Sequence, residues 1–508
     1  MTLANRSARA AVWEFSSVIL QAAAQFLVMA VLARLLTPAD FGLYAITTIV
    51  LGVIEMFAEI GVGSAVLQKK EPSEVYIQSA YTLSFLLAVA GIIFTWVCAP
   101  WAAAFFRQPE ATNLIRAASL ALLMSAYVTI STALFERELQ YKTLAIVNIA
   151  SYTIGFGLVG IGLALARMGP WAIIGASLAQ NLLRAILLYW IVRKPIKFRL
   201  SMGELRSLLG FGTGISLARI INYGAHQIDS VLVGRLIGSF ELGLYQMAFN
   251  IVDLPRRFLG SVIDRVGFAA MTHVQDDQSR LRAGYLGAVE LANIALLPVA
   301  VFLIFATPEF VRGILGEQWI GMVLPLQIML TQIPLRASIR MTDALCGAVG
   351  QVYRLASTKV IYFGMICVVV FVGIRWGLTG VAAGVTLAVI VNWLIMVGLA
   401  LRITRARIPS YLGTWIPGTT ISAVTAIVTF TGLRITRTLI GSDLLRLCAL
   451  GIFLACVLLS LFWIHPNVIG NTAISLIVDF GRQSPVFPKL FISLERRLTP
   501  ERTPGALD

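Results

Sequence analysis

The sequence predicts an all-α integral membrane protein with about fourteen transmembrane helices. Of its 508 residues, 58% are hydrophobic and only 13% are charged, whereas a soluble domain carries roughly a quarter of charged residues. The mean hydropathy is +0.84, and apolar runs of about 20 residues, the length that spans a bilayer, recur along the whole chain. Fourteen helices of about 22 residues take up roughly 310 residues, which leaves short loops and excludes a large catalytic domain outside the membrane.

Each predicted helix corresponds to one apolar run. Several runs are polar enough that twelve or thirteen helices are an alternative count. The predicted spans are 12–33, 41–66, 77–98, 113–134, 143–166, 170–192, 208–236, 241–267, 284–306, 322–345, 355–376, 378–401, 412–433 and 444–465.

The basic residues predict the orientation in the membrane. The net charge of +15 comes from Lys and Arg in the short loops between apolar runs, for example Arg193, Lys194 and Lys197. One side of the predicted membrane holds about twice as many basic residues as the other, and this side is normally cytoplasmic. We therefore expect both termini in the cytoplasm and interpret the charge as a topology signal, with no nucleic acid as partner.

An internal duplication is the most informative pattern. Residues 33–44 read AlaArgLeuLeuThrProAlaAspPheGlyLeuTyr, and residues 234–245 read GlyArgLeuIleGlySerPheGluLeuGlyLeuTyr. Further echoes at a shift of about 200–212 residues bring spans one to six onto spans seven to twelve. Because six is even, both copies enter the membrane from the same side, which predicts two parallel, pseudo-symmetric six-helix lobes. This is a transporter architecture.

The duplication also predicts the domain organisation. We expect an N-terminal six-helix lobe at 1–200, a C-terminal six-helix lobe at 201–403, two additional transmembrane helices at 404–466 and a cytoplasmic basic tail at 467–508.

The repeated motif itself has a local structural interpretation. Thr37 is a good helix cap, Pro38 suits the first helical position, and Asp40 lies where its carboxylate faces unpaired backbone N–H groups. The motif therefore predicts a tight extracytoplasmic turn without a direct role in function.

The first copy of the motif, followed by GluIleGlyValGlySerAlaValLeuGlnLysLys at 59–70 and GluArgGluLeuGlnTyrLys at 136–142, resembles the polysaccharide-transport family. These are the Wzx-like O-antigen and exopolysaccharide flippases, of the superfamily that also holds lipid II flippases and MATE multidrug exporters. The resemblance implies a MATE-like fold with fourteen helices in two lobes and alternating access. We expect no enzymatic activity and no cofactor.

The resemblance also implies the cargo. It is an undecaprenyl-pyrophosphate-linked oligosaccharide, moved from the cytoplasmic to the periplasmic leaflet of the bacterial inner (plasma) membrane for O-antigen, exopolysaccharide or capsule assembly. The implied partners are this lipid-linked oligosaccharide and membrane lipids, with polysaccharide polymerase and co-polymerase proteins as further candidates. The alternative is a MATE-like multidrug or cation exporter.

Charged residues inside predicted spans are the candidate functional residues, since each costs about 2.5–3.5 kcal/mol at the bilayer centre. The second copy is rich in them, and arginine suits a pyrophosphate because its planar fork binds two oxygens at once and stays protonated. The candidate anion-binding residues are Arg219, Arg256, Arg257, Arg336 and Arg340.

Internal ion pairing is the alternative explanation for these arginines. Asp253 lies three and four residues before Arg256 and Arg257, and Asp343 lies three residues after Arg340. No acid stands at such a spacing from Arg219 or Arg336, so these two are the strongest candidates for binding an anion.

Acidic residues inside spans are candidates for coupling transport to H⁺ or Na⁺. The candidates are Glu55, Glu59, Asp229 and Glu290.

Motifs of other functions are missing from the sequence. No Lys follows Gly, which excludes a P-loop, and the three histidines are too scattered to form a metal site. A glycan polymerase, the third hypothesis, would call for a long catalytic loop, which the sequence lacks.

Overall fold

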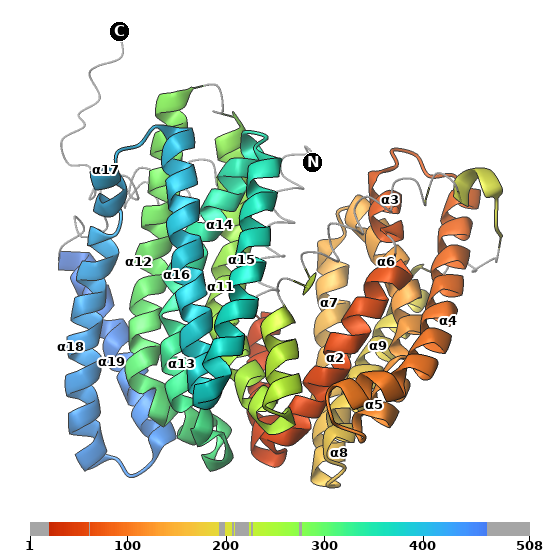
Figure 1. Cartoon of the computed structure of the whole chain (residues 1–508), viewed down its shortest axis with the longest axis horizontal. Coiled ribbons are helices and arrows are strands. Elements are labelled where there is room, and N and C mark those ends of the chain that lie inside the picture. Colours follow the sequence, from red (N-terminus) through yellow and green to blue (C-terminus); the bar gives the residue numbers. More distant parts are fainter. Residues whose placement is uncertain are drawn as a thin grey trace. The chain divides into compact units, whose positions relative to one another are not determined.

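The structure is a computed structural model and describes residues 20–59, 61–192, 199–205, 208, 223–224, 227–273 and 277–464. Every regular element in these ranges is a helix, and they contain no strand. The predicted all-α class is confirmed for this part of the chain (Figure 1).

Many of these helices are long and apolar enough to cross a bilayer. In the described residues eight helices meet this condition, or nine if the two helices on either side of a 43° bend near Thr331 form one span. A shorter apolar helix covers Leu20–Leu35. Large apolar side chains such as Trp101 and Phe371 are about two-thirds exposed, as expected where lipid surrounds the protein. The eight spans are Pro38–Ala58, Glu74–Phe105, Ala111–Arg137, Tyr141–Leu165, Pro170–Val192, Gln278–Leu315, Tyr353–Thr404 and Ile408–Leu439.

The chain forms two compact units. Unit 1 comprises Met1–Met247 and Ile374–Leu378, and unit 2 comprises Ala248–Gly373 and Thr379–Asp508. The units are defined by packing, whereas the predicted lobes are defined by the sequence repeat. Helix α11 (Ser239–His273) begins in unit 1 and continues in unit 2.

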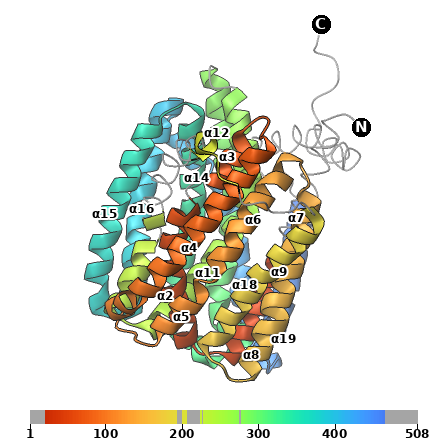
Figure 2. The same cartoon turned by 90° about the vertical axis from the view of Figure 1, so that its right-hand side faces the viewer.

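Unit 1 is a bundle in which α4 packs on α2 and α6, and α6 packs in turn on α9 (Figure 2). Its apolar core includes Ile54, Ala88 and Leu122, one from each of α2, α4 and α6. The elements of unit 1 before α11 are α2 (Pro38–Glu59), α3 (Val62–Gln68), α4 (Glu74–Phe105), α5 (Ala111–Ala118), α6 (Ala121–Arg137), α7 (Tyr141–Tyr152), η1 (Thr153–Gly160), α8 (Ile161–Leu165) and α9 (Pro170–Val192).

One predicted span is interrupted in the structure. The run 41–66 was predicted as a single helix, but α2 ends at Glu59 and α3 begins at Val62. Gly61 between them has a φ of 61°, a left-handed conformation that glycine adopts without steric penalty. Hydropathy does not reveal this break, because the 41–66 run as a whole stays apolar across it despite Glu59.

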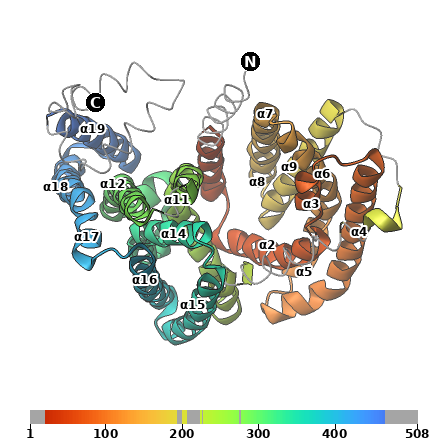
Figure 3. The same cartoon turned by 90° about the horizontal axis from the view of Figure 1, so that it is seen from above.

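Unit 2 contains the helices that carry the candidate site. Tyr285 of α12, Leu345 of α14 and Ala400 of α16 share one buried cluster, and α18 lies beside both α12 and α19 (Figure 3). The elements after α11 are α12 (Gln278–Phe310), η2 (Val311–Leu315), η3 (Glu317–Met322), α13 (Val323–Leu330), α14 (Gln332–Ala348), α15 (Val352–Gly373), η4 (Ile374–Trp376), α16 (Gly377–Thr404), α17 (Ile408–Gly413), α18 (Ile416–Leu439) and α19 (Asp443–Ile464).

The repeated turn has the predicted capping geometry in its first copy. The backbone N–H and the hydroxyl of Thr37 donate to Asp40 Oδ2 at 2.8 and 2.7 Å, and Thr37 Oγ1 accepts from the Asp40 N–H at 3.3 Å. This reciprocal arrangement satisfies donors at the start of α2. The prediction of a capped turn is confirmed.

The two copies of the turn also contact each other within unit 1. A Cβ atom on Gly42 would lie 1.8 Å from the carbonyl oxygen of Ser239, and a Cβ on Gly243 would lie 1.8 Å from that of Pro38. Only glycine permits such a close approach of two helix backbones.

Candidate anion-binding site

The candidate site lies beside a bend between two helices of unit 2. Helix α13 ends at Leu330 and α14 begins at Gln332, with a change in direction of 43°. Pro334 explains the break, because proline has no N–H to donate and its ring collides with the carbonyl four residues earlier, which is that of Leu330. Proline is tolerated in the first turn of the new helix. The bend places Arg336 in the second turn of α14.

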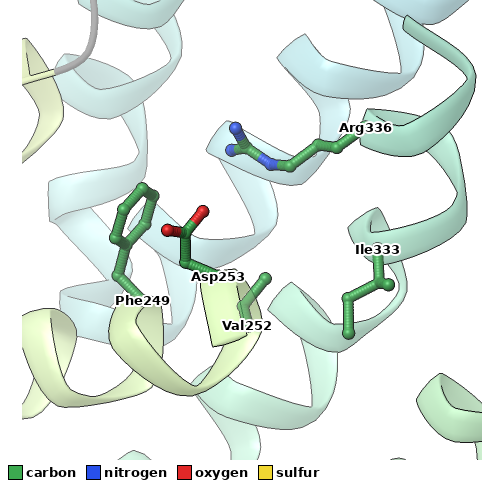
Figure 4. A pocket seen from close by; sticks show the side chains of 5 residues that line it. All are labelled: Phe249, Val252, Asp253, Ile333 and Arg336. Atoms are coloured by element: carbon green, nitrogen blue, oxygen red, sulfur yellow. The ribbon is translucent and has the colours of Figure 1, made fainter. Parts of the chain in front are cut away.

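A small pocket separates this part of α14 from α11. Its accessible volume is about 10 Å³, which is about the room that one water molecule needs. Figure 4 shows the Arg336 side chain reaching from α14 toward Asp253 and Phe249 of α11. The lining residues are Phe249, Val252, Asp253, Ile333 and Arg336. The space as it stands does not hold a group larger than about one water molecule.

The guanidinium of Arg336 is held on two sides. Its Nε donates a 2.9 Å hydrogen bond to Gln332 Oε1, and its Cζ lies 5.9 Å from the centre of the Phe249 ring, within cation–π distance. Among the described residues, no carboxylate oxygen lies within 4.0 Å of its nitrogens. The two terminal nitrogens of Arg336 therefore keep donors for a ligand.

Asp253 gives the pocket a second charge. This residue is 7% exposed, and its carboxylate points into the pocket in Figure 4. The sequence suggested Asp253 as the helical partner of Arg256 and Arg257, whereas the tertiary structure also brings it to the pocket of Arg336. A ligand in this pocket meets a cation and an acid side by side.

Of the other four candidate arginines, only Arg340 has a side chain in the described part of the structure. Arg340 lies one turn beyond Arg336 on α14 and is half-buried. Arg256 and Arg257 follow Pro255 on α11, which continues as a helix to His273, and their side chains lie outside what the structure describes. Arg219 also lies outside the described residues. Of the five candidates, Arg336 is the one that lines the pocket in the described part of the chain.

None of the candidate coupling acids is among the residues that line this pocket in the described part of the chain. Glu290 is buried on α12, and Glu55 is exposed on α2. Glu59 is the last residue of α2 and its side chain is outside the described part. Asp229 is buried in unit 1, where its carboxylate accepts from the Tyr245 hydroxyl and the Ser230 N–H at 2.7 Å each.

Asp343 forms an ion pair that the sequence did not suggest. Its Oδ2 lies 3.0 Å from the Nζ of Lys359 on α15. The sequence offered Arg340 as its helical neighbour, but a lysine on the next helix reaches the same carboxylate. Helix-to-helix contacts of this kind carry no signal in a single sequence.

Two residues of the site were missed by the sequence reasoning. Gln332 stands four positions before Arg336, a spacing that puts both on one helix face, so this partner could have been found. Thr386 lies on α16 and accepts a 2.6 Å hydrogen bond from Gln332 Nε2. No sequence pattern connects it to the site.

The fold and the pocket define a multi-pass helical membrane protein. The family described as "Polysaccharide biosynthesis protein" matches residues 31–324. This match covers more than half of the chain, and the chain belongs to this family.

Two curated relatives illustrate the family. The chain is 26% identical over 401 residues to an "Uncharacterized membrane protein in cps region" of Klebsiella pneumoniae, covering 78% of this chain and 82% of that protein. It is 23% identical over 331 residues to the "Lipopolysaccharide biosynthesis protein WzxC" of Escherichia coli, covering 65% of this chain and 67% of the relative. Both similarities support a bacterial membrane protein.

Solved structures show the same fold. The lipid II flippase MurJ in an inward closed conformation aligns with a TM-score of 0.70 at 14% identity, covering 90% of this chain and 99% of MurJ. An inward-facing MATE family multidrug transporter aligns with a TM-score of 0.60 at 17% identity, covering 78% of this chain and 99% of the transporter. The predicted MATE-like fold is therefore confirmed, while identities this low support the fold alone.

Proposed function

We propose that the protein is a secondary transporter that flips an undecaprenyl-pyrophosphate-linked oligosaccharide from the cytoplasmic to the periplasmic leaflet. The transported glycan serves O-antigen, exopolysaccharide or capsule assembly. Membership of the polysaccharide biosynthesis family and the likeness to WzxC support the class of cargo. The fold shared with MurJ and a MATE transporter is compatible with a transporter.

The observation that carries the proposal is the arrangement of Arg336. A cation inside an apolar helical bundle is costly, and a phosphate group offsets that cost by paired, charge-assisted hydrogen bonds. The terminal nitrogens of Arg336 have such donors, since its described contacts are a hydrogen bond from Nε and a ring face. Arg219, Arg256, Arg257 and Arg340 are proposed to add positive charge along the same route.

The proposed architecture follows the predicted repeats. It has fourteen transmembrane helices, in two parallel six-helix lobes at 1–200 and 201–403, two further helices at 404–466 and a basic tail at 467–508. Both termini are cytoplasmic in this proposal.

The transporter performs no covalent chemistry in this proposal. The pocket binds the diphosphate, and the lipid chain stays in the bilayer while the site is exposed to one side and then the other. Lipid-linked oligosaccharide and membrane lipids are the partners, and polysaccharide polymerases are candidate acceptors of the flipped product. Glu55, Glu59, Asp229 and Glu290 stay candidates for ion coupling.

The test replaces Arg336 in cells that depend on this protein for surface polysaccharide. We expect Arg336→Ala to lower export about tenfold or more, since a hydrogen bond to a charged group contributes about 1.5–3 kcal/mol. Leaflet-resolved labelling of lipid-linked sugars should show them retained on the cytoplasmic side. Arg434→Ala is the matched control, because Arg434 is exposed on α18 and its cation lies over the Phe430 ring.

Polysaccharide export is compared between variants that have equal protein abundance in the membrane, as measured by immunoblot. Export by Arg336→Ala at the level of Arg434→Ala would rule out the anion-binding proposal. Arg219→Ala is expected to act in the same direction as Arg336→Ala.

A MATE-like multidrug or cation exporter is the second candidate function. Phe249 and Asp253 in the pocket favour it, because an aromatic ring and a carboxylate together suit an organic cation. In that case Asp253→Asn would reduce drug resistance of the cell while surface polysaccharide stays unchanged. The flippase proposal predicts the opposite pattern for Arg336→Ala.

A further inference from the structure

A chain of three hydrogen bonds, two buried and one partly buried, connects Arg336 to the backbone of a neighbouring helix. Arg336 Nε donates to Gln332 Oε1 at 2.9 Å, Gln332 Nε2 donates to Thr386 Oγ1 at 2.6 Å, and Thr386 Oγ1 donates to the Ala382 carbonyl at 2.7 Å. Gln332 is fully buried and Thr386 is 7% exposed. The chain thus links α14 to α16 inside unit 2.

Chemistry fixes the direction of every bond in this chain. Arginine has donors only, so the atom of Gln332 that faces it must be the amide oxygen. The Ala382 carbonyl can only accept, so the Thr386 hydroxyl hydrogen is directed to it, and the Thr386 oxygen accepts from the Gln332 amide nitrogen. If the Gln332 amide were reversed, its nitrogen would face the Arg336 Nε–H, donor against donor. The observed orientation therefore has no alternative of equal quality.

This direction determines which edge of the guanidinium is available. Arginine can bind an oxyanion through its Nε–Nη edge or through its two terminal nitrogens. Gln332 occupies Nε, and the Phe249 ring lies near the guanidinium. The end with both terminal nitrogens is therefore the edge that can bind two oxygens at once.

We propose that Gln332 and Thr386 are positioning residues that hold Arg336 for end-on binding of a diphosphate. This inference rests on the proposed function. Neither residue contacts the ligand: Thr386 orients Gln332, and Gln332 orients the guanidinium. A largely buried polar chain of this kind fixes side-chain geometry more than it adds stability.

The test uses variants that interrupt this hydrogen-bond chain at one residue. Thr386→Val removes the hydroxyl, Thr386→Ser retains it, and Gln332→Leu removes the amide. Binding of undecaprenyl pyrophosphate to the purified full-length protein in nanodiscs is the readout. We expect Thr386→Val and Gln332→Leu to weaken binding about three- to tenfold, which is the effect of one hydrogen bond, and Thr386→Ser to restore it.

Thr404→Val is the matched control. Thr404 lies on the same helix, is buried, and its hydroxyl donates to the Ala400 carbonyl four residues earlier at 2.8 Å, as that of Thr386 does to Ala382. Its described hydrogen bond ends within its own helix. We expect Thr404→Val to bind like the wild type.

A second measurement separates positioning from general packing. In an Arg336→Lys background, which lacks the Nε donor, Thr386→Val should have no further effect, and the double variant Gln332→Leu/Thr386→Val should be no weaker than either single variant. Additive losses in these combinations would overturn the inference. So would a Thr386→Val variant that binds like Thr404→Val.

The two proposals fail in distinguishable ways. If Arg336→Ala binds undecaprenyl pyrophosphate as tightly as the wild type, the proposed function fails. If Arg336→Ala loses binding while Thr386→Val and Gln332→Leu retain it, only the positioning role fails.

Discussion

Gly42 and Gly243 lie 201 positions apart and contact each other's helices reciprocally. Each glycine packs on the backbone carbonyl of the residue at which the other's helix begins, Ser239 for Gly42 and Pro38 for Gly243. The same shift of 201 relates the two motifs in the sequence. The repeat is therefore visible in the structure as a symmetric contact between two helix starts.

Replacing Gly42 should destabilise this contact. A methyl group at Gly42 would lie 1.8 Å from a carbonyl oxygen, so α2 and α11 must separate, and such overpacking costs about 1–3 kcal/mol. We expect Gly42→Ala and Gly243→Ala to lower the midpoint of thermal unfolding of the purified protein. Gly162→Ala is the control, because a Cβ there has no atom within 4 Å; equal midpoints for all three variants would contradict the prediction.

Arg437 should stabilise unit 2 by pairing with a buried acid. Its Nε and Nη2 lie 2.8 and 2.6 Å from Oε1 of Glu309 on α12, and the glutamate side chain is 4% exposed. Since Arg437 itself is about half exposed, we expect Arg437→Ala to cost roughly 1–3 kcal/mol, mostly from the unpaired buried carboxylate.

The neighbouring arginine on α18 provides the control for Arg437. Arg434→Ala removes a cation that lies 4.9 Å from the Phe430 ring centre and should change the unfolding midpoint little. The prediction fails if both variants unfold at the same temperature.

Asp277 should make the stability of the α12 start depend on pH. Hydrogen bonds from the Ser279 side chain and the Arg280 N–H lower the pKa of this N-cap carboxyl below its usual range. A lowered pKa in the folded state means that the stabilisation is present above the unfolded-state pKa of about 3.9 and is lost as pH falls through the folded-state pKa. The unfolding midpoint of Asp277→Ala should thus lie below that of the wild type at pH 7, and the difference should shrink below about pH 4. A constant difference over this range would show that charge is not involved.

The termini should lie on the same side of the membrane. The bias of basic residues predicts a cytoplasmic location for both, and an even number of spans is required for this. Alkaline phosphatase and fluorescent-protein fusions at each end measure the side directly. An active phosphatase at the C-terminus alone would exclude fourteen spans.

Much of the helical layout could be predicted from the sequence. The predicted spans 170–192 and 444–465 agree within one residue with α9 and α19, because a bilayer demands a run of apolar residues that hydropathy detects directly. The Thr37–Asp40 cap was also predictable, since a capping box depends on residues three apart. The break at Gly61 and the bend at Thr331 were not predicted, because hydropathy averaged over a span hides the few polar residues beside them, although Pro334 carries a signal for the bend.

The sequence by itself determined the class of protein, the repeat and the arginines worth testing, since each of these depends on composition or on neighbours within one helix. Only the tertiary structure decided which side chains meet: Asp253 beside Arg336, Lys359 on Asp343, and Thr386 behind Gln332. The physical reason is that the rotation and pairing of helices in a bundle are set by many small packing contacts. None of these contacts appears in the periodicity of a single helix.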